Sequence, residues 1–593
     1  MNKKENPENI NTGVNTDVRE DMNLLLSVRG LTISFPEGNG RHEAVRDLSF
    51  DLHKGDIVGV VGESGSGKSM TALAMMGLLP KSASIDRGEI FFKGRNLFSM
   101  TPEERRSLRG AEMAMVFQEP MTSLNPVMRI EEQVGENLEL HTDLSKDEIH
   151  KRVVEALEAV GINDAEQSCR KYPHELSGGQ RQRVMLALAT ICSPDLLIAD
   201  EPTTALDVVV QEQILRLLMR INLERGISIM FISHDLNVVK RLCDRVVVVY
   251  QGELVEQGLT DEVLYHPKHE YTKKLVSQIP LRDDLGAKTE TVMSLQNLNV
   301  FYDIRGGLFR KKGKKHVIHD MSFNLHDGEI LGVVGESGCG KSTLCKAIIG
   351  LHKDYTGIIW TKPGLRPQMV FQDPFSSLNP AHTVEWIMEE PLKVRGIAAS
   401  ERKQRVAGML TEVGLDPSYA ERKPRELSGG QRQRISIGTA LLMESGFIIA
   451  DEPVSALDVT VQSQIVKLLL RLHEEKNMTM MFISHDLDMV RRICRRVLVV
   501  YRGEIVEGGR SEEVYGKPAH PYTRMLLKAT QGEGHDEDAV AMNALPVKVP
   551  DDYPGCPFYP RCEQHCDRCA HEKPPMVELP GNHAAKCFRI AEG

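Results

Sequence analysis

The stretch "GVVGESGSGKSMTAL" at residues 59–73 decides how this chain folds, because it returns as "GVVGESGCGKSTLC" at residues 332–345. Each copy follows an apolar segment of strand length and leads into a helical pattern. A strand, a glycine loop and a helix, in that order, form the arrangement that binds phosphate groups. The sequence therefore predicts two phosphate-binding units.

Other motifs of the chain also occur twice. "LSGGQRQRV" at 176–184 returns as "LSGGQRQRI" at 427–435, and "IADEP" at 198–202 returns at 449–453. Apolar strands alternate with helical stretches such as "VVVQEQILRLLMRINLE", which is typical of an α/β fold with a mainly parallel sheet. We predict two such domains in tandem, at residues 23–280 and 294–530, with a linker at 281–293. Residues 1–22 are expected to be a disordered tail, and residues 531–593 a cysteine-rich C-terminal tail.

The charge, the apolar runs and the cysteines of the chain indicate which classes of protein it can belong to. The 593 residues carry a net charge of −10, which gives no reason to expect a nucleic-acid partner. No run approaches the 18 apolar residues of a membrane helix, and the polar start lacks the apolar region of a signal peptide. Six of the eleven cysteines are scattered before residue 556, as expected in a reducing compartment. We expect a soluble or peripheral protein.

Both glycine loops match the pattern GxxxxGKS. Glycines allow consecutive backbone N–H groups and the following helix N-terminus to point at an anion. The lysine reaches the β- and γ-phosphates, and the serine hydroxyl ligates Mg²⁺. The residues expected to bind phosphate are Gly62, Ser64, Gly65, Gly67, Lys68 and Ser69 in the first copy and Gly335, Ser337, Gly338, Gly340, Lys341 and Ser342 in the second.

Paired carboxylates end two apolar strands, at Asp200 with Glu201 and at Asp451 with Glu452. Beside a phosphate loop, the aspartate is expected to hold hydrated Mg²⁺ and the glutamate to activate the attacking water. The alternative is a pair of solvated turn carboxylates. His234 and His485 follow the next apolar strands, where ligands bind in such sheets, and we assign them to the γ-phosphate.

With "LSGGQ" at 176–180 and 427–431, these motifs resemble the nucleotide-binding subunits of ABC transporters over residues 24–530. The resemblance implies two P-loop ATPase domains, each with a RecA-like core and antiparallel β and helical subdomains, that pair within one chain. It implies that each half clamps the ATP of the other through its signature residues. It also implies a Mg²⁺-sensing glutamine, an aromatic ring on adenine and an aspartate at the contact between the halves. The residues so implied are Ser177, Gly179, Ser428 and Gly430 for the signature, Gln118 and Gln372 for Mg²⁺, Phe35 and Tyr302 for adenine, and Asp207 and Asp458 for the contact.

Two further stretches, "HPKHEYTKKL" at 266–275 and "KPAHPYTRML" at 517–526, resemble importers of oligopeptides, dipeptides, glutathione and nickel. That subfamily implies two membrane permeases, an extracytoplasmic solute-binding protein, no nucleic acid, and a peripheral place on the cytoplasmic face of the inner membrane. The rival hypothesis is a soluble tandem ATPase that acts on ribosomes or nucleic acid. The transported solute is not encoded in such a subunit.

Five cysteines gather in the tail, in "CPFYPRCEQHCDRC" and at Cys587. Adjacent thiolates in a reducing compartment suit zinc or an iron–sulfur cluster, and their spacing leaves zinc, a cluster and empty thiols open. Resemblance to importers that carry a 4Fe–4S cluster favours iron at Cys556, Cys562, Cys569 and Cys587, with Cys566 as an extra thiol.

Three smaller features complete the interpretation. The second loop has Cys339, and Phe35 stands where the family has tyrosine; neither should abolish ATP binding, so we predict two hydrolysing sites. The basic run "RGGLFRKKGKKH" at 305–316 is either a solvated hairpin or a contact with lipid headgroups or a membrane partner.

Overall fold

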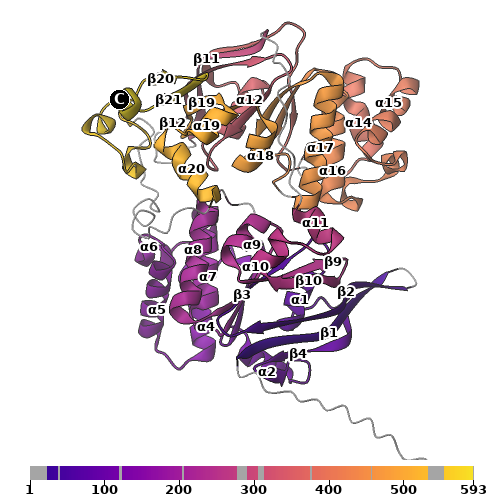
Figure 1. The fold of residues 1–593 in the computed structure, drawn as a ribbon, viewed down its shortest axis with the longest axis vertical. Helices are drawn as coiled ribbons and strands as arrows, with labels where there is room; N and C mark the ends of the chain where they lie inside the picture. The colour runs from indigo at the N-terminus through magenta and orange to yellow at the C-terminus, as the bar shows by residue number, and fades with distance from the viewer. Residues whose placement is uncertain are drawn as a thin grey trace, which may run out of the picture.

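The structure is a computed structural model that describes residues 23–591 except 38–39, 119–122, 204–205, 207, 277–289, 305–312, 374–376, 456 and 532–552. The chain forms two similar bodies, here called the first half (23–276) and the second half (290–531), followed by the cysteine tail (553–591). Figure 1 shows the first half below the second. The N-terminal tail, Asp207 and most of the predicted linker lie outside the described residues.

Two sheets build the first half. An antiparallel sheet has the order β2-β1-β4-β5, and a second sheet has the order β10-β9-β3-β8-β7-β6, with only β10 antiparallel. The strands are β1 (Leu24–Glu37), β2 (Gly40–His53), β3 (Ile57–Val61), β4 (Ser84–Phe92), β5 (Arg95–Asn96), β6 (Met113–Val116), β7 (Leu196–Asp200), β8 (Ser228–Ser233), β9 (Arg245–Tyr250) and β10 (Glu253–Leu259).

The second half repeats this plan with a larger main sheet. Its antiparallel sheet is β12-β11-β14, and its main sheet is β15-β16-β17-β13-β18-β19-β21-β20. The strands are β11 (Thr291–Ile304), β12 (Gly313–His326), β13 (Ile330–Val334), β14 (Tyr355–Thr361), β15 (Gln368–Val370), β16 (Phe447–Asp451), β17 (Thr479–Ile483), β18 (Arg496–Tyr501), β19 (Glu504–Arg510), β20 (Met576–Leu579) and β21 (His583–Lys586). Strand β11 begins at Thr291, inside the predicted linker, and β12 includes the end of the basic run, whose residues 305–312 are outside the described residues.

Helices cover the sheets. Those of the first half are α1 (Lys68–Met75), α2 (Pro102–Leu108), α4 (Ile130–His141), α5 (Lys146–Ala159), α6 (Ala165–Cys169), α7 (Gly178–Thr190), α8 (Val208–Arg225), α9 (Leu236–Leu242), α10 (Thr260–Tyr265) and α11 (Glu270–Val276). Those of the second half are α12 (Lys341–Ile348), α14 (Val384–Val394), α15 (Ala399–Glu412), α16 (Gly429–Leu441), α17 (Val459–Lys476), α18 (Leu487–Ile493), α19 (Ser511–Gly516) and α20 (Pro521–Gln531), and the tail ends in α22 (Phe588–Ala591). Short 3-10 helices lie at Pro173–Glu175, Pro417–Glu421, Pro424–Glu426, Tyr559–Arg561 and Asp567–Ala570.

Both faces of each main sheet are buried. In β3, Val58 and Val60 join the apolar cluster that contains the antiparallel strands, whereas Ile57 and Val61 join the cluster of the helices on the opposite face. Side chains alternate along a strand, so a strand covered on both faces is apolar throughout. The uninterrupted apolar run that precedes each glycine loop has this origin.

The cysteine tail is built into the second half. Strand β21 pairs antiparallel with β19 and with β20, so two tail strands extend the main sheet. Buried Cys556, Phe558, Cys569 and Phe588 belong to the large apolar cluster of the second half. The tail is therefore part of that half's core, at the outer edge of its sheet (Figure 1).

The two halves touch each other. The guanidinium of Arg241 donates to the carbonyl oxygen of Ala529 at 3.0 Å, and Val208 and Val209 pack against the core of the second half. Figure 1 shows α20 ending at the top of α8. The two halves of one chain therefore contact each other directly.

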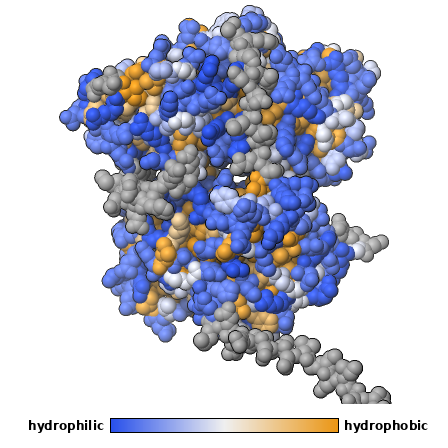
Figure 2. Space-filling model, viewed as in Figure 1, coloured by the Kyte–Doolittle hydropathy of each residue, from blue (hydrophilic) through white to orange (hydrophobic). Residues whose placement is uncertain are grey.

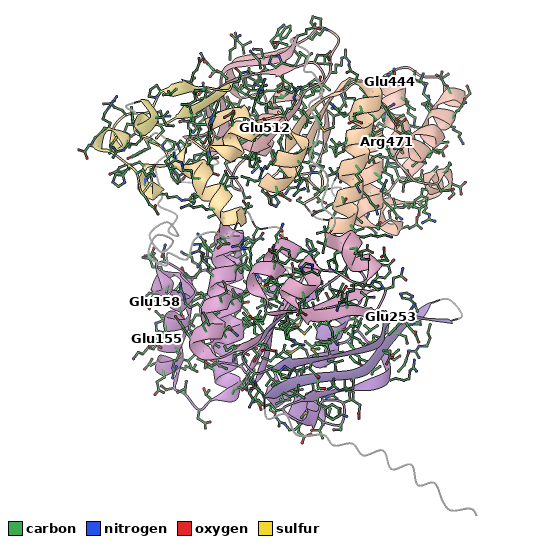
Figure 3. All side chains as sticks on the ribbon, in the orientation of Figure 1. Glu155, Glu158, Glu253, Glu444, Arg471 and Glu512 are labelled. Carbon is green, nitrogen blue, oxygen red and sulfur yellow. The ribbon has the colours of Figure 1, made fainter. Side chains whose placement is uncertain are left out.

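Charged residues dominate the outer surface, with small apolar patches between them (Figure 2). Glu155, Glu158, Glu253, Glu444 and Glu512 are exposed and lie on the outer faces of both halves (Figure 3). Within the described ranges, every helix is too short or too polar to pass through a bilayer.

Candidate active sites

Each glycine loop is shaped by backbone that only glycine tolerates. Gly67 has φ +96°, and a Cβ there would lie 2.5 Å from the carbonyl oxygen of Ala44. Gly340 has φ +109°, and its Cβ would lie 2.7 Å from a methyl group of Ile318. These glycines let the first phosphate loop (62–69) and the second phosphate loop (335–342) curl tightly before α1 and α12.

The loop lysines are buried and point back into their loops. The ammonium of Lys68 donates to the carbonyl oxygens of Gly62 at 2.8 Å and Glu63 at 2.7 Å. The ammonium of Lys341 donates to Gly335 at 2.6 Å and Glu336 at 3.0 Å. Burial lowers the pKa of Lys68, against the charges of Glu201 and Asp200. A buried cation in a glycine loop that leads into a helix N-terminus is suited to polyphosphate.

The aspartates that end β7 and β16 face the loop serines. The hydroxyl of Ser69 donates to Asp200 at 3.1 Å, and Ser342 hydrogen bonds to Asp451. Burial raises the pKa of both carboxyl groups. Among the described residues, Oδ1 of Asp451 is buried without a hydrogen-bond partner. A serine hydroxyl beside an underused buried carboxylate is an oxygen donor set that fits Mg²⁺.

The two glutamates are held by the predicted glutamine and histidine of the same half. The amide nitrogen of Gln118 donates to Glu201 at 2.7 Å, and that of Gln372 donates to Glu452 at 2.7 Å. Nδ1 of His234 lies 3.2 Å from Glu201. Nδ1 of His485 lies 3.4 Å from Glu452. The structure therefore brings each glutamate, glutamine and histidine into one cluster.

These contacts set the charge of the cluster. Burial acts to lower the pKa of His234 and His485, but the hydrogen bond and charge of the neighbouring glutamate raise it above the usual value. Burial acts to raise the pKa of Glu452, but His485 and Lys341 lower it. Glu452 is thus held ionised, as a general base requires.

The backbone at both glutamates is unusual. Glu201 has φ +47° and Glu452 has φ +45°, in the left-handed region that residues other than glycine rarely adopt. The same conformation thus occurs at equivalent positions of both halves. Strained backbone of this kind gathers at functional sites.

The signature serines begin helices. Ser177 caps α7 and accepts a hydrogen bond from the N–H of Gln180 at 3.3 Å, and Ser428 caps α16 in the same way. A Cβ on Gly179 would lie 2.7 Å from Val210, and one on Gly430 would lie 2.5 Å from Val461. Among the described residues, no hydrogen bond joins either serine to the phosphate loop of the opposite half.

The two predicted adenine rings are half-buried on equivalent strands. Phe35 lies opposite His42 in the β1–β2 pair, and Tyr302 lies opposite Lys315 in the β11–β12 pair. The ring of Tyr302 packs against His352, with ring centroids 4.4 Å apart.

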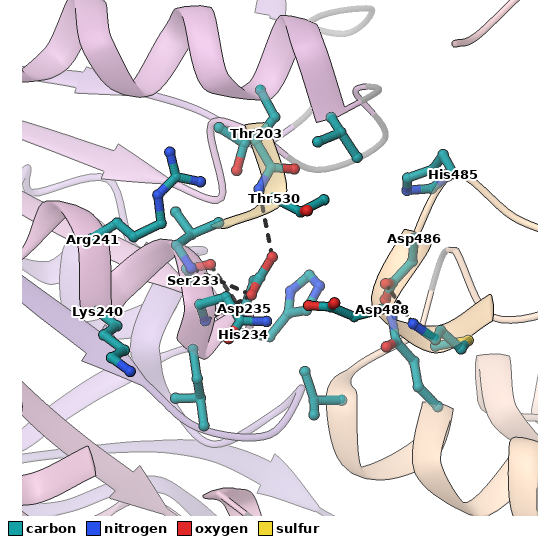
Figure 4. A pocket seen from close by; sticks show the side chains of 18 of the residues that line it. Thr203, Ser233, His234, Asp235, Lys240, Arg241, His485, Asp486, Asp488 and Thr530 are labelled. Atoms are coloured by element: carbon teal, nitrogen blue, oxygen red, sulfur yellow. Dashed lines mark hydrogen bonds between the residues drawn. The ribbon is translucent and has the colours of Figure 1, made fainter. Parts of the chain in front are cut away.

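A cavity of about 430 Å³ lies between the halves. His234 and Asp235 approach it from the first half, and His485, Asp486 and Asp488 approach it from the second (Figure 4). Asp458 of the second half acts electrostatically on Lys68 of the first. The post-strand histidines and the aspartate predicted for the contact therefore lie near the seam.

Sequence reasoning missed one pair of residues at these sites. The hydroxyl of Tyr271 accepts from the N–H of Glu63 at 3.0 Å, and that of Tyr522 accepts from the N–H of Glu336 at 2.9 Å. Both tyrosines lie in the repeated "HEYTKKL" and "HPYTRML" stretches, so their duplication was the available signal. They tie the end of each half to its phosphate loop.

The tail cysteines converge. The N–H of Cys556 donates to the carbonyl oxygen of Cys569 at 2.8 Å, and Sγ of Cys566 lies 3.5 Å from Sγ of Cys569. Burial, with help from neighbouring thiols, raises the pKa of Cys556 to about 12 and that of Cys562 to about 11. The charge of Cys587 also acts to raise the pKa of Cys556, Cys562 and Cys569. The predicted fourth cysteine therefore joins the group.

Comparison with known proteins agrees with this geometry. The chain matches the family described as ABC transporter over residues 45–204 and 318–455. It also matches the family described as oligopeptide/dipeptide transporter, C-terminal region, over residues 255–300 and 506–569.

Full-length relatives share both halves. The chain is 44% identical to the peptidoglycan transport ATP-binding protein YejF of Agrobacterium fabrum over 525 residues, which cover 85% of this chain and 96% of that protein. It is 41% identical to the glutathione import ATP-binding protein GsiA of Salmonella typhimurium over 559 residues, which cover 86% and 90%. With two phosphate loops, a cluster of glutamate, glutamine and histidine beside each of them and these relatives, the chain is an ATPase that belongs to the ABC transporter family.

Proposed function

We propose that this chain hydrolyses ATP to power import of a small peptide-like solute through two partner membrane permeases. The observation that carries the proposal is the duplicated cluster of lysine, aspartate, glutamate, glutamine and histidine beside each phosphate loop. The relatives are named for glutathione import and peptidoglycan transport, and the matching C-terminal region for oligopeptide and dipeptide transport. Peptide bonds are common to these solutes.

The residues suggest how one ATP is cleaved. Lys68 or Lys341 neutralises the phosphates, and Glu201 or Glu452 takes a proton from the water whose oxygen attacks the γ-phosphorus. The bond to the β-phosphate oxygen breaks, which releases ADP and phosphate. Gln118 and His234, or Gln372 and His485, orient the glutamate. Ser69, Asp200 and Gln118, or Ser342, Asp451 and Gln372, would hold Mg²⁺, which would neutralise charge on the phosphates.

We also propose that the ATP sites are shared between the halves. Each adenine stacks on Phe35 or Tyr302, and each γ-phosphate meets Ser177 and Gly179 or Ser428 and Gly430 of the opposite half. The effect of Asp458 on Lys68 supports this arrangement. The chain then works at the cytoplasmic face of the inner membrane, where closing and opening of the halves moves the permeases.

Reconstitution tests the proposal. With its permeases in lipid vesicles, the chain is expected to hydrolyse ATP several-fold faster when the loaded solute-binding protein is added. A peptide recovered from that binding protein and identified by mass spectrometry would name the solute. Copurification with ribosomes or nucleic acid, without permeases, would favour the soluble tandem ATPase instead.

We further propose that Cys556, Cys562, Cys569 and Cys587 hold a 4Fe–4S cluster. Four thiols suit both iron–sulfur and zinc, but tetrahedral zinc would draw four sulfurs to about 3.8 Å from one another. Among the described residues, only Glu131, His150 and Cys169 form a trio of ligand atoms within 4.8 Å of one another, so no three tail sulfurs lie that close together. Sulfurs this far apart fit the larger iron–sulfur cluster better than a single zinc ion.

Metal analysis checks the cysteine assignment. Chain purified without oxygen is expected to contain about four iron atoms and matching acid-labile sulfide. Serine at any of the four assigned cysteines should remove most of the iron, whereas Cys566→Ser is the matched control that should retain it. One zinc atom per chain and no iron would decide for the zinc alternative.

A further inference from the structure

Glu336, in the second phosphate loop, is contacted by a charged residue of the cysteine tail. The guanidinium of Arg561 forms two hydrogen bonds of 3.0 Å to the two carboxylate oxygens of Glu336. Glu336 also donates its N–H to Tyr522 and accepts from Lys341 through its carbonyl oxygen. Arg561 lies between Cys556 and Cys562 in sequence. The tail therefore holds the same loop residue that holds the phosphate-binding lysine.

The first phosphate loop repeats the tyrosine and lysine contacts of Glu336 at Glu63, but not the contact with an arginine. Glu63 donates its N–H to Tyr271 and accepts from Lys68 through its carbonyl oxygen. Its carboxylate forms no ion pair with any residue that the structure describes. One molecule thus carries two versions of the loop, which differ in this bidentate ion pair and in the residue next to the lysine, Ser66 in the first and Cys339 in the second.

The pair is shielded from water. The side chains of Arg561 and Glu336 are 13% and 19% exposed. The guanidinium also lies 5.9 Å from the ring centre of Tyr501 and 5.7 Å from that of Phe558. Charges with little water around them are weakly screened, so the carboxylate depends on Arg561 for neutralisation.

Without its ion pair, the negative charge of Glu336 would weaken ATP binding at the second phosphate loop. Its charge already acts on Cys339 in the middle of the loop. ATP brings several negative charges to that loop, and like charges repel at this range. Arg561 removes this repulsion at the second site, and it is positioned only while the tail is folded around its cysteines.

We propose that Arg561 is a positioning residue for the second ATP site, which makes ATP affinity there, and not at the first site, depend on the folded cysteine tail. This inference rests on the proposed function to the extent that both loops bind ATP. It gives the tail a regulatory role at one of the two sites.

Single-site chains provide the test. Full-length Lys68→Ala keeps only the second loop, and full-length Lys341→Ala keeps only the first. Each is titrated calorimetrically with a non-hydrolysable ATP analogue and Mg²⁺. Arg561→Gln is expected to raise the Kd about tenfold in the Lys68→Ala chain, which corresponds to about 1.4 kcal/mol. In the Lys341→Ala chain it should change the Kd less than about twofold.

A second variant separates charge from folding. Adding Glu336→Gln to Arg561→Gln removes the unpaired carboxylate, so the second-site Kd should return to within about threefold of its starting value. A purely structural role would give no such recovery.

A substitution in the cysteine tail is the last part of the experiment. Cys562→Ser should weaken the second site as Arg561→Gln does, and should add little to the Arg561→Gln chain. Equal losses in both single-site chains, or no loss in the Lys68→Ala chain, would overturn the inference. If neither single-site chain binds the analogue before any change at Arg561, the assignment of the phosphate loops fails instead, so the two failures are distinguishable.

Discussion

Replacing Glu201 and Glu452 together with glutamine is expected to lower ATP turnover about 10²-fold or more while ATP remains bound. Glutamine keeps the size and most of the hydrogen bonding of each side chain, but it cannot accept a proton from water. Both glutamates already lie against a glutamine and a histidine of their own half, so the substitution should disturb little else.

The measurement is phosphate release at saturating ATP, with bound ATP counted after rapid filtration. Each single glutamine variant shows what its site contributes, because the other glutamate remains. His234→Gln is a useful comparison, since it disturbs the cluster without removing the base. Near-normal turnover in the double variant would refute the assignment of these glutamates as general bases.

Ser428→Arg is expected to release ATP trapped at the first site, and Ser177→Arg to release ATP trapped at the second. An arginine at a helix N-cap places a long cation where the shared-site arrangement puts the γ-phosphate of the opposite half. The affected site should lose about tenfold or more of its trapped nucleotide, because the two halves can no longer close on it.

Photoaffinity labelling of the Glu201→Gln, Glu452→Gln chain reads out each site separately. A protease site introduced between residues 281 and 290 then separates the labelled halves. Loss of label from the half that carries the substitution, with the other half unaffected, would contradict sharing across the seam.

The fold was predictable because its signals are local and occur twice. Glycine loops between a strand and a helix, and carboxylates at strand ends, place Lys68, Asp200 and Glu201 at one edge of a sheet without any long-range information. The contacts from Gln118 and His234 to Glu201 follow from the same edge.

Other features depend on contacts that sequence spacing does not encode. The domain prediction placed the second half from residue 294, whereas β11 begins at Thr291, because the polar residues before Thr291 do not mark where the strand starts. The contact of Arg561 with Glu336 joins residues 225 positions apart. Arg561 stands in a run of cysteines, and the spacing of those cysteines indicates a metal or cluster site but no ion pair. Tertiary packing alone reveals that pair.

The left-handed backbone at Glu201 and Glu452 lowers the folding stability at two positions where activity requires glutamate. Any side chain at these two positions costs on the order of 1 kcal/mol of folding free energy compared with glycine, which adopts the conformation freely. A search for heat-resistant variants would therefore favour glycine at both positions and so select inactive protein. Glutamate nevertheless stands at both positions, against the preference of the fold itself.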